Sequence, residues 1–195
     1  MDTMERFEEA MHEGEDAVQE LIEELRMRRE IGDGVFEPGI ELVNERDSSG
    51  RTPLMMAASF ARARIVKLLI REGADVREQD YGNEDALAWA AVSGDPETVT
   101  ALIDAGADVN GSDSDSTVAL HWAAKTGNVA LVDALIQSGA EIDEKNANGE
   151  TLLDVARLKA GTTGFRRIID ILEARTLSGR DSLMSCPVRG REATL

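Results

Sequence analysis

Few residues in this chain have a type and spacing that would support catalysis or metal binding. The sequence of 195 residues contains two histidines, His12 and His121, and a single cysteine, Cys186. His12 lies in a charged segment with no cysteine or second histidine nearby, so it lacks the ligand set of a zinc site. His121 has the chemistry of a general base or a metal ligand. An enzyme would also need a pocket of convergent titratable groups, and none is predicted.

Two polar segments match ligand-binding loops only in part. Residues 113–117, with the sequence DSDST, begin like a calcium-binding loop. However, the sixth position is Val118 instead of glycine and the twelfth is Ala124 instead of glutamate. Residues 161–164, with the sequence GTTG, lack the Lys-Ser/Thr pair of a phosphate-binding loop. The first segment is therefore predicted to be a solvated loop tip and the second a loop between helices, and no cofactor is expected.

Two tryptophans suggest contact with another protein. Trp89 and Trp122 share a register with Met56 and Val155, because the same interval separates each of these residues from the next. Aromatic and methionine side chains in a row are typical of binding hot spots. Packing between neighbouring structural units is the favoured interpretation of the same tryptophans, and both roles could hold if one ring edge stays exposed. The interval of 33 residues between the two tryptophans places them at equivalent positions of two repeated units.

That interval recurs along most of the chain. The segments Gly-Ala-Asp-Val, Gly-Ala-Asp-Val and Gly-Ala-Glu-Ile begin at residues 73, 106 and 139. Leu54, Leu87, Leu120 and Leu153 keep the same spacing. A period of about 33 residues is typical of a solenoid, in which each unit buries its apolar face only against its neighbours.

Each unit reads locally as two helices after a turn. Thr52-Pro53 is a helix start, because Thr can cap free N–H groups and Pro has no donor to lose at the first helical position. A second helix is expected at about 63–72, ended by Gly73 in the left-handed conformation. In two units the pattern departs: Asp85 and Val118 replace the capping threonine, and of these only Asp85 can cap.

These residues closely resemble the ankyrin repeat. The segments RTPL at 51–54 and ALHWAAKTG at 119–127 match its helix-turn core. The resemblance implies an all-α solenoid of helix-turn-helix units with β-hairpin-like fingers, with repeats at about 46–78, 79–111, 112–144 and 145–177. It gives His121 a structural role, a hydrogen bond between adjacent units, in place of a general base.

The resemblance also implies where a protein partner would bind: at the finger tips and at the residues after each Ala-Ala pair. With the two tryptophans, the candidate contact residues are Ser48, Ser49, Arg51, Phe60, Tyr81, Glu84, Trp89, Ser114, Asp115, Trp122, Lys125 and Thr126, to which Ser59, Val92 and Ser93 are added by position. Phe60 and Tyr81 lead this set, because exposed aromatic residues have little structural reason to be there.

The ends of the array differ in composition. Residues 1–45 are expected to form a degenerate capping repeat, with an apolar stripe at Phe7, Met11, Val18, Leu21, Ile22 and Leu25. Fifteen acidic against four basic residues give this segment a net charge of −11 out of −17. Residues 178–195 lack periodicity and are expected to be a flexible tail.

The leading functional hypothesis is a non-catalytic adaptor or scaffold that presents a concave surface to a protein partner. The alternative is an acidic inhibitor or immunity-type protein that captures and neutralises a basic enzyme or toxin. The pI of about 4.5 argues against direct nucleic-acid binding and against anionic membrane surfaces. The lone cysteine, the acidic N-terminus and the lack of a long apolar run favour a cytoplasmic location, and a monomer is expected.

Overall fold

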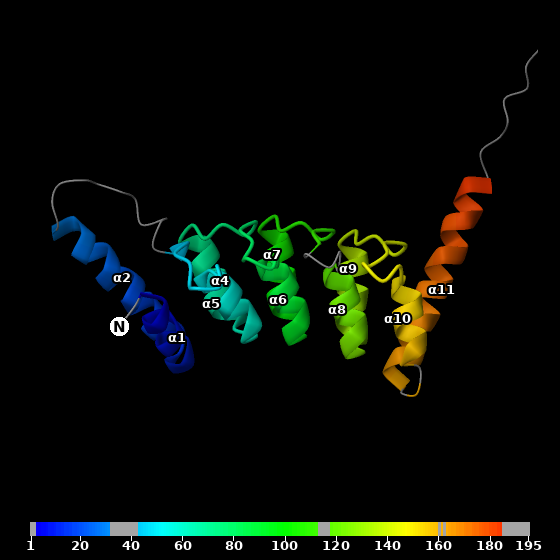
Figure 1. Cartoon of the computed structure of the whole chain (residues 1–195), viewed down its shortest axis with the longest axis horizontal. Coiled ribbons are helices and arrows are strands. Elements are labelled where there is room, and N and C mark those ends of the chain that lie inside the picture. The colour runs from blue at the N-terminus through cyan, green and yellow to red at the C-terminus, as the bar shows by residue number, and fades with distance from the viewer. Residues whose placement is uncertain (1–2, 32–42, 113–117, 160, 162, 185–195) are drawn as a thin grey trace, which may run out of the picture.

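The computed structural model describes residues 3–31, 43–112, 118–159, 161 and 163–184, and these residues form a single file of helix pairs (Figure 1). One row consists of the first helix of each pair, and these helices pack against one another in order. The second row consists of the second helices, packed in the same order. The first row is α1 (Thr3–Glu13), α4 (Pro53–Ser59), α6 (Ala86–Ser93), α8 (Ala119–Thr126) and α10 (Leu152–Leu158). The second row is α2 (Glu15–Ile31), α5 (Ala63–Arg71), α7 (Pro96–Asp104), α9 (Val129–Gln137) and α11 (Thr163–Met184). The expected all-α solenoid is confirmed.

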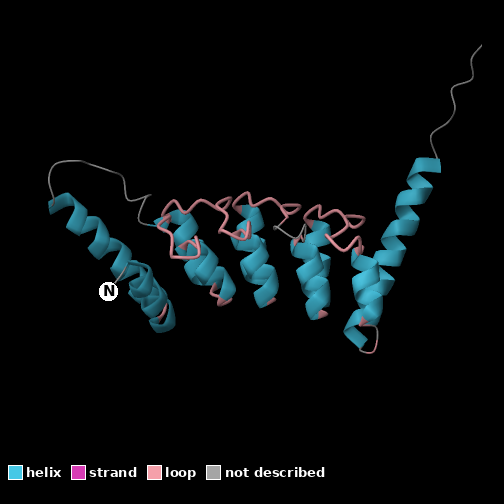
Figure 2. Cartoon of the chain, viewed as in Figure 1, coloured by secondary structure: helices cyan, strands magenta, loops and turns pink. Residues whose placement is uncertain are grey.

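Loops between the pairs form fingers along one edge of the array, and tight turns within the pairs lie along the other (Figure 2). Among the described residues, three isolated β-bridges close the fingers, at Gln79–Asp85, Ser112–Val118 and Lys145–Thr151. Asn83 replaces a finger glycine and adopts φ 58°, the left-handed conformation that Asn tolerates better than most residues. We call the two sides the finger edge and the turn edge.

The predicted helix starts are present. The hydroxyl of Thr52 and the carboxylate of Asp85 accept hydrogen bonds from the backbone N–H groups of Met55 and Ala88. Asp95 caps α7 in the same way, whereas Val118 makes no side-chain cap on α8. The first-row helices α4, α6, α8 and α10 each begin at the finger edge and end at the turn edge (Figure 2).

The core follows the register of the repeat. Leu54, Leu87 and Leu120 are at most 1% exposed, which confirms Leu120 as a core position. All six apolar residues of the predicted N-terminal stripe are also buried, on α1 and α2. The break between these two helices falls at Gly14, where φ is 131°. The first helix pair therefore covers the apolar face of α4 and α5, as a cap should.

The C-terminal helix is longer than the sequence predicts. α11 runs to Met184, so the predicted start of the tail at residue 178 lies inside a helix. Ser178 and Gly179 do not end it; a glycine within a helix costs only about 1 kcal/mol relative to alanine. Residues 185–195, including Cys186, lie outside the described residues.

Candidate protein-binding surface

The predicted contact residues lie on two separate edges. Ser48, Ser49, Arg51, Tyr81 and Glu84 belong to the fingers, whereas Ser114 and Asp115 lie outside the described residues. Phe60, Lys125 and Thr126 lie at the ends of first-row helices, on the turn edge. A helix of seven or eight residues separates these edges by roughly 10–12 Å. The tryptophans lie within α6 and α8, between the two edges.

At the finger edge, Arg51 joins the first finger to Trp89. Its guanidinium lies 6.0 Å from the centre of the Trp89 ring and also donates to Asp47 Oδ2 at 2.8 Å. The Trp89 Nε1–H donates to Asp80 Oδ2 at 3.1 Å, so the indole is half-buried and its polar atom has a partner. Trp89 therefore packs within the repeat, with one face covered by a cation.

Asp47 holds this cluster in place. Partial burial favours the neutral carboxyl, but hydrogen bonds from the backbone and side chain of Arg51 and from the Ser49 N–H outweigh it and lower the pKa of Asp47. The carboxylate stays ionised at neutral pH and fixes the finger turn together with the Arg51 side chain.

Trp122 has a similar arrangement with a different cation. The Lys125 ammonium lies 4.1 Å from the centre of its ring, three residues further along α8. The indole Nε1 is shielded from solvent and has no hydrogen-bond partner among the residues that the structure describes. Both tryptophans are thus partly buried and pack against the core, and their role in binding a partner stays a prediction.

Tyr81 is the most exposed aromatic residue that the structure describes, at 76%. Its ring nevertheless lies over the preceding finger: a Cβ placed on Gly50 would come within 2.9 Å of the Tyr81 ring carbon Cδ1. The Tyr81 N–H donates to the Ser49 carbonyl at 3.1 Å. One ring face therefore rests on finger one, and the rest is open to solvent.

On the turn edge, exposed apolar side chains recur from unit to unit. Phe60 and Val92 are each 42% exposed and Leu158 is 76% exposed, and all three lie where a first-row helix ends. Val92, Lys125 and Leu158 share one register, each a single repeat beyond the one before. The Phe60 ring also meets the His12 imidazole of the cap, with 5.4 Å between ring centres. We call Phe60, Val92, Lys125 and Leu158 the turn-edge row.

Leu158 is the member that sequence reasoning missed. Its place one full repeat beyond Lys125 was a signal that could have found it. Thr126, next to the row, is exposed, but its hydroxyl donates to the Ala123 carbonyl at 2.9 Å, so it also caps α8.

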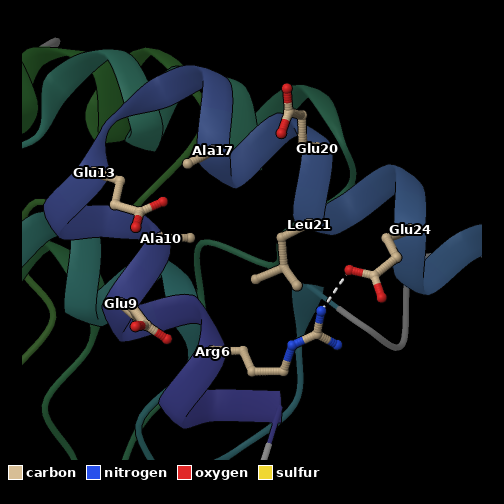
Figure 3. Close-up of a pocket in the computed structure, with 8 residues that line it drawn as sticks. All are labelled: Arg6, Glu9, Ala10, Glu13, Ala17, Glu20, Leu21 and Glu24. Atoms are coloured by element: carbon tan, nitrogen blue, oxygen red, sulfur yellow. Dashed lines mark hydrogen bonds and ion pairs between the residues drawn. The ribbon is translucent and has the colours of Figure 1, made fainter.

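A second surface feature lies on the N-terminal cap. Glu9 and Glu13 of α1 face Glu20 and Glu24 of α2 across a groove of about 490 Å³ (Figure 3). Its floor is lined by Ala10, Ala17 and Leu21, and Arg6 forms an ion pair with Glu24 at one end. This groove is acidic, with an apolar floor.

His121, the candidate general base of the sequence, lies on neither of these surfaces. His121 is 1% exposed within α8, a position that suits packing and not contact with a substrate. Among the residues that the structure describes, no group of three or more His, Cys, Asp or Glu side chains could hold a metal ion. In the same residues, no helix has the length and apolar character needed to cross a membrane.

Comparison with known families agrees with this architecture. A family model described as ankyrin repeats (3 copies) matches residues 8–113 and again residues 87–172. The chain belongs to the ankyrin-repeat family. The match starts within α1, so it includes part of the cap as well as the units that follow. Ankyrin repeats generally mediate protein–protein interaction and are typically non-catalytic. A search of curated proteins found no match.

Proposed function

We propose that this ankyrin-repeat protein is a non-catalytic adaptor that binds a protein partner through the turn-edge row. The observation that carries the proposal is the gathering of exposed apolar groups at the ends of first-row helices in units one, two and four. Phe60, Val92 and Leu158 are three of the four large hydrophobic residues that are exposed in the described part of the chain. Single exposed apolar residues are normal, whereas apolar side chains gathered along one edge favour an interaction site there.

The chemistry of the row supports a partner with an extended apolar segment. The row supplies aliphatic and aromatic contacts from units one, two and four, and the Lys125 ammonium over Trp122 in unit three. A partner that follows the row would bury these side chains successively, with a carboxylate opposite Lys125. α4, α6 and α8 are each packed between two first-row helices, and α10 is packed against α8 and α11, so these helices would not need to reorganise on binding.

Photo-crosslinking tests the proposal. A photoreactive residue at Val92 is compared with one at Thr100, an exposed residue of α7 in the same unit. We expect a discrete protein to be captured from cells at position 92 and not at position 100. The captured protein, once purified, should bind a Phe60→Ser/Val92→Ser variant at least tenfold more weakly than the unmodified chain. Equal capture at both positions, or equal affinity for the variant, would reject the row as the binding surface.

A second candidate function is an inhibitor that captures a basic enzyme or toxin through the acidic cap. The acidic groove favours it, because clustered carboxylates accelerate association with a basic partner. Binding in this case should be fast and strongly weakened by salt, since screening reduces interactions between exposed charges. Association that is indifferent to salt would favour the adaptor.

A further inference from the structure

The C-terminal face of the solenoid exposes positions that the other units bury. Leu153 occupies the register of Leu54, Leu87 and Leu120, which are at most 1% exposed, yet Leu153 is only partly buried. Each of the other three helices packs against a following first-row helix, and the described residues contain no first-row helix after α10. Apolar surface therefore remains uncovered at this end.

The second row shows the same difference. The segment RIIDIL at 167–172 matches RIVKLL at 64–69, which places Ile169 in the position of Val66. Val66, and its equivalents Val99 and Val132, are 0% exposed, whereas Ile169 is only partly buried. Both helices of the last unit thus have an uncovered apolar position.

A fifth ankyrin unit does not fit this face. Ala58, Ala91 and Ala124 are fully buried and allow neighbouring first-row helices to approach closely. Arg157 stands at the same position in unit four, exposed and paired with Glu173 of α11 at 2.8 Å. A long charged side chain at this position calls for an acidic occupant instead of another close-packed helix.

Charge around this face is positive, in contrast to the chain as a whole. Residues 157–175 contain five basic and two acidic residues, a net charge of +3 in a chain of −17. The basic residues, all exposed, are Arg157, Lys159, Arg166, Arg167 and Arg175. We call Leu153, Arg157, Arg166 and Ile169 the C-terminal face.

The opposite end of the same molecule has the complementary properties. Residues 3–25 contain nine acidic residues and one Arg, a net charge of −8. They include the four glutamates of the groove between α1 and α2, whose floor is apolar (Figure 3). The two ends lie at opposite extremes of the array (Figure 1).

We propose that the chain assembles head to tail, with the acidic groove of one copy docked on the C-terminal face of a second copy. Two acidic grooves would repel each other. The charges therefore favour a head-to-tail contact instead of a symmetric contact between two N-terminal ends. Because the two surfaces lie at opposite ends, each copy can bind two others, and assembly continues beyond a dimer into chains or rings of copies. Physiological salt limits charge interactions to about 8 Å, so the total charge of −17 gives little repulsion between copies that touch only at their ends. This departs from the monomer expected from the sequence.

The test is a charge swap with the purified chain alone, followed by sedimentation velocity at increasing concentration. One variant carries Glu13→Lys and Glu20→Lys at the groove, and the other carries Arg157→Glu and Arg166→Glu at the C-terminal face. We expect the unmodified chain to form species larger than a monomer, each variant alone to lose them, and a mixture of the two variants to regain them. An Asp104→Lys/Asp143→Lys variant, which changes exposed residues of the middle units, should assemble like the unmodified chain.

Circular dichroism of each variant distinguishes loss of assembly from loss of folding. An unmodified chain that stays monomeric at every concentration would overturn the proposal. So would assembly that persists in both reversal variants, or a mixture of folded variants that stays monomeric. Since no other protein is present, the result is independent of whether the turn-edge row binds a partner.

Discussion

The Gly127→Ala substitution tests how closely the last unit is locked onto the one before it. Gly127 ends α8 with φ 72°, and a Cβ there would lie 2.8 Å from Cε2 of Phe165 on α11. Carbon atoms do not approach this closely, and Phe165 is only 9% exposed, so its ring has little room to move. Gly94 ends α6 in the same way with φ 79°, but its nearest neighbour would be Asn128 Nδ2 at an ordinary 3.5 Å.

The two substitutions therefore share one cost and differ in another. Forcing alanine into the left-handed conformation costs about 1–2 kcal/mol at either position. Overpacking against the Phe165 ring adds about 1–3 kcal/mol at Gly127 alone. We expect a free energy of unfolding lowered by roughly 2–5 kcal/mol for Gly127→Ala and by roughly 1–2 kcal/mol for Gly94→Ala.

Urea unfolding followed by circular dichroism measures both values. Phe165→Leu, which removes the ring edge, provides the background for a double-mutant comparison. In that background Gly127→Ala should cost no more than Gly94→Ala does in the unmodified chain. Two results would show that α11 does not pack against Gly127. One is an equal loss in free energy of unfolding for the two substitutions in the unmodified chain. The other is a loss for Gly127→Ala that is undiminished when residue 165 is Leu.

Four other substitutions give separate checks by the same unfolding assay. Leu120→Ala should lower the free energy of unfolding by about 2–5 kcal/mol and Leu153→Ala by clearly less, because only Leu120 is fully buried; similar losses would contradict an open C-terminal face. Burial, with a smaller contribution from nearby Asp108, raises the pKa of Asp85 in the folded protein. The stability that the neutral carboxyl contributes is therefore fully present below the pKa of the unfolded state. It is lost as the pH rises through the pKa of the folded state. Asp85→Asn, an equally good cap, should therefore stabilise the protein at neutral pH by less than about 1 kcal/mol, with the gain vanishing in acid; a gain that persists below pH ~3.9 would refute the assignment. Tyr81→Ala should change stability by no more than about 0.5 kcal/mol, and a larger loss would mean that its contact with finger one is structural.

The repeat made most of the fold predictable because its signals are local. Helix starts are indicated by Thr52, Asp85 and Asp95, whose side chains accept hydrogen bonds from the backbone N–H groups three residues further on. These local hydrogen bonds do not depend on the rest of the molecule. Asn83 could likewise be expected to replace a finger glycine, because Asn tolerates the left-handed conformation better than most residues. The sequence does not reveal that α11 continues past Ser178 and Gly179, because weak local breakers do not decide where a helix stops.

The candidate surface was less predictable because its contacts join different units. The sequence places Phe60 and Tyr81 in one set of contact residues, yet they lie on opposite edges. The covering of Trp89 by Arg51 depends on how two fingers approach, which no spacing within a unit reveals. For Leu158, the register was visible in the sequence but the exposure was not. That exposure depends on the position of α10 as the last described helix of the first row.

Single-file packing has a consequence for how the chain acquires its structure. The main contacts between units join segments about one repeat apart, so few native contacts wait for the ends of the polypeptide to meet. Low sequence separation favours rapid folding. A chain emerging from the ribosome can thus order its first units as soon as neighbouring pairs are available to cover one another, and later pairs then add to them, leaving the basic end to form last.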